Sequence, residues 1–159
     1  MKKSISIAVL FGCLQFLVVS TDAGTKPPQE KRWQKPMIGY IKNEDLVDLC
    51  GCSFEHITRE RGYTFASDPE NKTTWMNIDG IDVNLKLTHF SGSKRHRIGS
   101  RYLEIFEAEG VKAVLQKVVT RLCVPYGPEC ETTGYDVTIT VTRGNRRQTV
   151  KAKGQCGCV

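Results

Sequence analysis

Residues 137–158 read VTITVTRGNRRQTVKAKGQCGC, and this stretch decides the fold class. Apolar residues alternate with threonines over 137–142, and the alternation resumes over 149–153 after the pair Gly144-Asn145. A period of two places the apolar side chains on one face of a strand, and a Gly-containing pair between two such runs is typical of a tight turn. The stretch therefore predicts a β-hairpin with one buried face and one wet face.

A second hairpin is expected upstream. Apolar and polar residues alternate over 81–88, the segment 74–78 precedes them, and Asp79-Gly80 is a two-residue turn signal between the two runs. We expect the apolar faces of the two hairpins to share one core, which consists of Val83, Leu85, Leu87, Val137, Ile139 and Val141.

Two segments are harder to interpret. The apolar positions of 111–122 fit a helical stripe, whereas Val118-Val119-Thr120 is β-branched. We expect a strand there, because a neighbouring hairpin needs a third partner for stability. The residues from Asn43 to Leu49 predict a short capped helical turn that ends at Gly51.

These patterns predict one mainly β domain over 43–159. Its expected fold is a small antiparallel sandwich or partly closed barrel with a short helical element and three disulfides. Removal of a leader of 23 residues would leave 136 residues, which suffice for one domain with a real core.

The first residues have the order of a secretory signal. Lys2-Lys3 is followed by an apolar run over 5–19 and by small and polar residues up to Ala23, which predicts a signal peptide over 1–23. The run is too short for a spanning helix, so no transmembrane span is expected after cleavage. A lipoprotein anchored at Cys13 is the minor alternative. Residues 24–42 are rich in proline and basic residues and predict a flexible arm.

Cleavage after Ala23 would leave six cysteines, Cys50, Cys52, Cys123, Cys130, Cys156 and Cys158. An even number in an exported chain predicts a disulfide framework. We expect the turn-rich 123–130 segment to bring its two end cysteines together, and the two Cys-Gly-Cys pairs to bridge each other. The alternative is a four-sulfur metal site of Cys50, Cys52, Cys156 and Cys158, or a thiol-redox role for the same pairs.

Four segments of the chain resemble a family of small exported bacterial proteins without an assigned activity. The segments are the two Cys-Gly-Cys pairs, WMNIDG at 75–80 and TGYD at 133–136, and the resemblance covers roughly residues 48–158. It implies a periplasmic or extracellular location in a bacterium. It transfers no catalytic residue and no cofactor, and we expect no cofactor.

The positive residues suggest a class of partner. Without residues 1–23 the chain loses two of its 23 basic residues and one of its 17 acidic residues, so its net charge is +5. The candidate residues of a polyanion-binding surface are Lys94, Arg95, Arg97, Arg146 and Arg147, and the alternative, which turn-like flanking glycines favour, is that they are simply solvated turns. No interleaved aromatic residue is evident beside them, so base stacking is not expected.

Nothing in the sequence specifies a catalytic mechanism. His56, His89 and His96 lack the context of a triad, and acids such as Asp79, Asp82 and Glu104 have no diagnostic spacing. We therefore expect a non-catalytic binding or structural module of the periplasm or cell exterior. Its partner would be an acidic protein, a polyanion or an anionic envelope surface. A metal-binding or thiol-redox protein is the second hypothesis, and a cell-envelope hydrolase or its inhibitor is the third.

Overall fold

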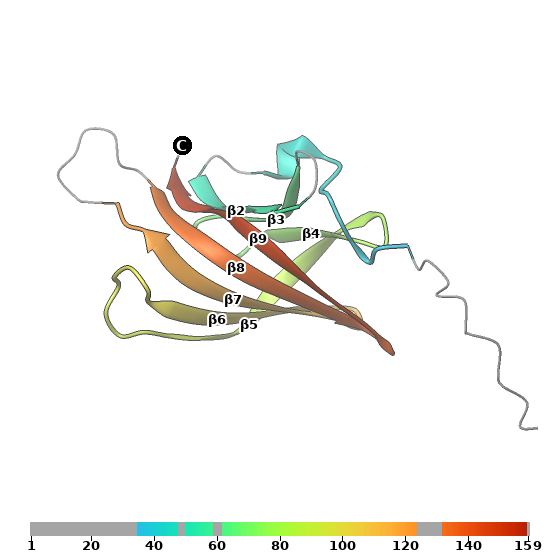
Figure 1. The fold of residues 1–159 in the computed structure, drawn as a ribbon. Coiled ribbons are helices and arrows are strands. Elements are labelled where there is room, and N and C mark those ends of the chain that lie inside the picture. Colours follow the sequence, from blue (N-terminus) through green and yellow to red (C-terminus); the bar gives the residue numbers. More distant parts are fainter. Residues whose placement is uncertain (1–34, 48–49, 59–61, 124–131, 159) are drawn as a thin grey trace, which may run out of the picture. The chain divides into compact units, whose positions relative to one another are not determined.

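Eight strands of the chain close into an antiparallel barrel in the computed structural model (Figure 1). The structure describes residues 35–47, 50–58, 62–123 and 132–158. The barrel strands are β2 (Cys50–His56), β3 (Tyr63–Ser67), β4 (Thr74–Ile78), β5 (Ile81–Gly92), β6 (Arg101–Ala108), β7 (Val111–Arg121), β8 (Thr132–Arg143) and β9 (Arg146–Cys158). A two-residue strand, β1 (Ile38–Gly39), lies outside this ring and pairs with β4.

The barrel is an up-and-down meander in which each strand pairs with the next. Strand β9 then pairs with β2 and completes the ring. The expected antiparallel β fold is confirmed. The finer expectation, a sandwich or a partly closed barrel, is corrected to a closed barrel, because the ring of strand pairs is complete. Closure depends on the long strands: β5 pairs with β4 through 81–85 and with β6 through 86–92.

The barrel interior is the predicted shared core. Leu85, Val137, Ile139 and Val141 are buried, and Val83 and Leu87 pack against them. Both predicted hairpins form, with turns at 79–80 and 144–145. The largest buried side chains that fill the interior are Phe54, Phe65, Phe106, Met37, Ile38, Met76, Ile78, Leu85 and Leu115.

Segment 111–121 is a strand, as expected. Its buried positions alternate strictly, but one of them is Lys117, whereas Val114 and Val118 lie on the other face and are only partly buried. A polar residue inside and apolar residues outside conceal the period of two. This is why the apolar residues alone resembled a helical stripe.

The expected helical element is a single 3-10 turn, Glu44–Leu46, in which the Asn43 side chain accepts a hydrogen bond from the backbone N–H of Asp45. The described residues contain no α-helix. Gly51 does not end the turn. It lies within β2, where a side chain would collide with the backbone oxygen of Ser67.

The domain begins earlier than the expected boundary at residue 43. Met37, Ile38 and Ile41 are buried, and β1 pairs with the end of β4. Residues 37–41 therefore pack against the barrel, although the sequence placed them in the arm. The signal over 1–23, the alternative anchor at Cys13 and the arm over 24–34 lie outside the described residues, and they stay predictions.

Two disulfides join β2 to β9 at one end of the barrel, Cys50–Cys158 and Cys52–Cys156. Each joins residues that are directly opposite in the strand register. The prediction that the two Cys-Gly-Cys pairs bridge each other is confirmed. The third expected bridge involves Cys130, which lies outside the described residues, so the pairing of Cys123 with Cys130 stays a prediction.

Candidate anion-binding end of the barrel

The two basic segments lie at opposite ends of the barrel. Lys94, Arg95 and Arg97 are in the β5–β6 loop, and Arg146 and Arg147 follow the β8–β9 turn. Figure 1 shows this turn at one end of the strands and the β5–β6 loop at the other. The five residues therefore do not form the single surface that was expected, because the two hairpins turn in opposite directions along the barrel.

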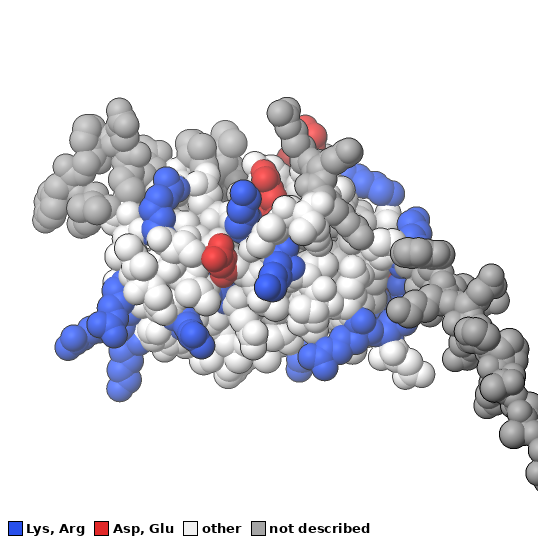
Figure 2. Space-filling model, viewed as in Figure 1, with Lys and Arg blue, Asp and Glu red and all other residues white. Residues whose placement is uncertain are grey.

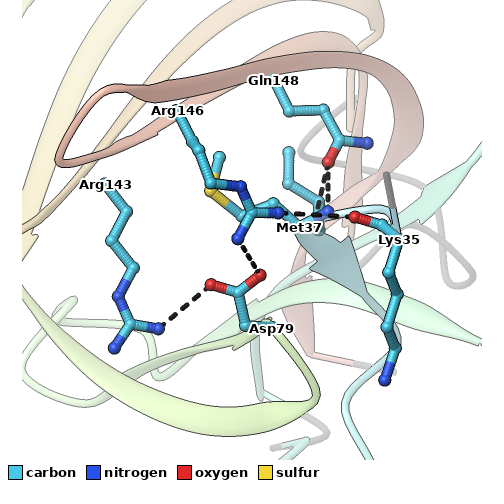
Figure 3. Close-up of polar contacts among 7 residues, drawn as sticks. Lys35, Met37, Asp79, Arg143, Arg146 and Gln148 are labelled. Carbon is cyan, nitrogen blue, oxygen red and sulfur yellow. Dashed lines mark hydrogen bonds and ion pairs between the residues drawn. The ribbon is translucent and has the colours of Figure 1, made fainter. Parts of the chain in front are cut away.

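At the β8–β9 end, Asp79 in the β4–β5 turn forms ion pairs with Arg146 and Arg143 (Figure 3). Arg146 Nη1 lies 2.7 Å from Asp79 Oδ1, and Arg143 Nη1 lies 3.2 Å from Oδ2. Arg146 Nη2 also donates a hydrogen bond of 3.4 Å to the backbone oxygen of Lys35. Arg146 thus links three chain segments, and of the two arginines predicted to bind a ligand here only Arg147 stays outside this network.

The β5–β6 loop is held in one shape by Ser100, which is 4% exposed. Its hydroxyl donates a hydrogen bond of 2.7 Å to the backbone oxygen of Arg95 and accepts one of 2.9 Å from the N–H of Arg97. The backbone N–H groups of Gly99 and Val119 bond across to Val119 and Ser100, respectively. The loop is therefore tied both to itself and to β7.

Four cations surround this loop. Lys94, Arg95, Arg97 and Arg101 are all exposed, and the ion pairs of the described residues involve none of them. Figure 2 shows Lys and Arg side chains that project at the end where the β5–β6 loop lies, with no acidic side chain visible among them in this view. Their positive field is not cancelled locally.

Aromatic side chains accompany these cations, contrary to the expectation from the sequence. The ring of Phe90 stacks on Tyr102 with centroids 6.1 Å apart, and Tyr102 Oη shares a hydrogen bond of 2.7 Å with Nδ1 of His96 in the loop. Ile98 at the loop turn is 64% exposed and Phe90 is 57% exposed. We call this surface the basic tip, and it consists of Phe90, Lys94, Arg95, His96, Arg97, Ile98, Arg101 and Tyr102.

The aromatic part was missed because of a bulge. The register of β5 against β6 shifts between Leu87 and His89, so that Phe90 stands opposite Glu104. Simple alternation from Leu85 and Leu87 would place Phe90 on the outer face. The only sequence signal was the pair of aromatic residues that flank the basic segment, Phe90 before it and Tyr102 after it.

A groove of about 690 Å³ adjoins the basic tip on the outer face of the barrel. It starts at Gly92 and Arg101, crosses β7 and β8 beside Gln116 and Thr138, and reaches Lys151. Its wall is mixed in polarity. A soluble chain-like ligand bound at the tip could continue along this groove, whereas a flat bilayer surface could not enter it.

The candidate acid–base residues are engaged in other contacts. Glu104 forms an ion pair with Lys117 inside the barrel, where both side chains are buried. The Lys117 ammonium lies 5.3 Å from the ring centre of Tyr135. Burial raises the pKa of Tyr135 to about 12, with smaller contributions from Tyr102 and Glu104, so this phenol stays protonated at physiological pH. Glu104 and Lys117 therefore neutralise each other in the closed interior of the barrel.

The sulfur atoms of Cys50, Cys52, Cys156 and Cys158 are all joined in disulfides. The oxidised pairs therefore provide no thiolate for a metal ion. Within the described ranges, no group of three or more His, Cys, Asp or Glu residues is arranged to hold one. Disulfides of this kind are typical of an oxidising compartment outside the cytoplasm.

The part of the chain that the structure describes has no helix with the length and hydrophobicity needed to span a bilayer.

The family resemblance of the Cys-Gly-Cys and WMNIDG segments stays a prediction. Comparison of the chain with models of known protein families, with curated proteins and with solved structures gives no match.

Proposed function

We propose that this protein is an exported, non-catalytic binding module that attaches to negatively charged partners through the basic tip. The observation that carries the proposal is the set of four cations, Lys94, Arg95, Arg97 and Arg101, without an acidic partner among the described residues. Exposed cations without counter-charges hold an anionic partner by releasing its counterions.

The rigidity of the loop supports binding. Ser100 fixes the backbone at Arg95 and Arg97 before any partner arrives. A preorganised loop loses less conformational entropy on association than a mobile one. The hydrogen bond between His96 and Tyr102 also ties the aromatic cluster to the same loop.

The non-catalytic assignment rests on how the polar groups are used. The carboxylates of Glu104 and Asp79 are engaged in ion pairs, and the exposed charged residues of the tip are cations rather than a matched acid and base. The two disulfides support placement outside the cytoplasm. We assign the finer location, periplasmic or extracellular in a bacterium, from the signal-like N-terminus and the family resemblance.

Binding of fluorescent heparin, measured by anisotropy, tests the proposal. We compare wild type with a tip variant, Arg95→Ser with Arg97→Ser, and with a control, Arg147→Ser with Lys153→Ser, which removes the same charge elsewhere. Wild type and control should bind, with affinity falling steeply between about 50 and 200 mM salt, and the tip variant should bind at least tenfold more weakly. Equal binding by both variants would refute the proposed tip.

A further inference from the structure

We infer that the basic tip docks on the surface of an anionic lipid bilayer, with Ile98 and Phe90 entering the interfacial layer. This inference rests on the proposed function, and it names the partner. Bilayers that contain anionic lipids attract exposed Lys and Arg residues, and their interface also accepts apolar side chains. The basic tip offers both kinds of group.

Ile98 is the first argument for a bilayer. It occupies a tight turn closed by the hydrogen bond from the N–H of Ser100 to the oxygen of Arg97, and the next residue, Gly99, has a φ of +82° that favours glycine. The turn thus holds Ile98 outward at 64% exposure, with Arg97 immediately before it. A soluble polyanion has no apolar phase in which this side chain would be buried.

Phe90 and Tyr102 are the second argument. Phe90 is 57% exposed and lies against Tyr102, whose hydroxyl bonds to His96. Aromatic side chains with an apolar body and a polar end are enriched at the boundary between lipid and water. Through Tyr102 the aromatic pair is connected to the loop that carries the cations, so apolar and positive groups lie at the same end of the barrel.

A soluble anionic glycan or nucleic acid fits the tip less well. Nucleic-acid binding would use a series of aromatic platforms, whereas the tip exposes mainly the one ring of Phe90, and Ile98 does not stack on bases. A glycan would be expected to follow the groove past Gln116 and Thr138, where Ile98 takes no part. The exposed isoleucine therefore distinguishes the bilayer from these partners.

The test compares vesicle sedimentation with heparin binding for three forms of the full mature chain. These are wild type, Ile98→Ser and the control Ile81→Ser, which alters the same residue type at 65% exposure at the start of β5, at the opposite end of that strand. Vesicles contain phosphatidylglycerol with phosphatidylcholine, or phosphatidylcholine alone. We expect Ile98→Ser to bind anionic vesicles about tenfold more weakly than wild type, with heparin binding unchanged and Ile81→Ser like wild type in both assays.

A second measurement checks insertion directly. In an Ile98→Trp variant, the fluorescence added relative to wild type should shift to the blue on anionic vesicles and be quenched by brominated acyl chains. If Ile98→Ser and Ile81→Ser bind anionic vesicles equally, or if the added tryptophan is not quenched, the bilayer inference is overturned while heparin binding leaves the proposed function intact. If wild type binds neither heparin nor anionic vesicles, the proposed function itself fails.

Discussion

The side-chain oxygen of Gln148 accepts a hydrogen bond of 2.6 Å from the backbone N–H of Met37, which is 111 residues away in the chain (Figure 3). The same oxygen accepts a second bond of 3.0 Å from Ile38. Met37 is only 2% exposed, and Ile38 is buried as well. Gln148 of β9 thus satisfies two buried backbone donors of residues 35–43, which we call the N-terminal segment.

Gln148→Ala should leave both N–H groups without this partner and lower the free energy of unfolding by about 1 to 3 kcal/mol. Gln116→Ala, an exposed glutamine of β7, is the matched control and should change stability by less than about 0.5 kcal/mol. Urea unfolding measures both values. Equal effects would show that the N-terminal segment is not anchored by Gln148.

The two disulfides should be strongly non-additive. They close nested loops with sequence separations of 108 and 104, and once either exists the other closes only a small additional ring. A chain constraint of this length is worth about 4 to 5 kcal/mol in the loop-entropy account. Replacing Cys52 and Cys156 by Ser should therefore cost much less than replacing all four cysteines. Equal losses for each successive bridge, measured by urea unfolding, would contradict this reasoning.

The face assignment of β8 is tested by two neighbouring substitutions. Ile139 is fully buried, whereas Thr140 lies on the outer face and bonds to Thr149. Ile139→Ala should cost about 2 to 5 kcal/mol because it leaves a cavity, and Thr140→Ala should cost much less. Equal shifts of the urea unfolding midpoint for the two variants would show that the assignment of buried and outer faces is wrong.

Asp82 should make stability depend on pH in the acid range. Burial alone would raise its pKa, but the hydrogen bonds from Asn77 Nδ2 and from the N–H groups of Asn43 and Lys42 outweigh burial and lower it from the ordinary value of 3.8. A lowered pKa stabilises the fold above the ordinary value, and this contribution is lost as the pH falls through the folded value.

The stability difference between wild type and Asp82→Asn should accordingly be largest near pH 7 and should shrink below about pH 4. Urea unfolding at several pH values measures it. Asp68, whose pKa is also lowered, is present in both proteins and its effect cancels. A difference that is constant with pH would show that the charge of Asp82 does not stabilise the N-terminal segment.

Local patterns in the sequence were sufficient to predict the hairpins. The alternation around Ile139 indicated its strand and its buried face, and the two Cys-Gly-Cys pairs were correctly expected to bridge each other. The expected bridges bring the two cysteine segments together, but alternation did not show that they pair as strands and close the ring, because the β2 and β9 partners are about 100 positions apart in the chain.

The candidate site was predicted only in part, because local patterns do not reveal contacts between segments that are distant in the sequence. The basic segment from Lys94 to Arg97 is visible in the sequence, but its aromatic partner Phe90 is brought beside Tyr102 by a bulge that alternation does not reveal. The ion pair of Arg146 with Asp79 joins the β8–β9 hairpin to the β4–β5 turn, which are far apart in the sequence. Charge runs in a sequence therefore indicate where cations lie, but not which of them remain available.

The most direct test of the basic tip locates binding residue by residue. Isotope-labelled protein is titrated with a short heparin oligosaccharide, and backbone amide shifts are followed by NMR. Binding at the basic tip predicts that the largest changes fall within 93–102, at Arg95, Arg97 and their neighbours, and that 143–148 at the opposite end changes little. Largest shifts at 143–148, or no shifts within 93–102 at low salt, would contradict it.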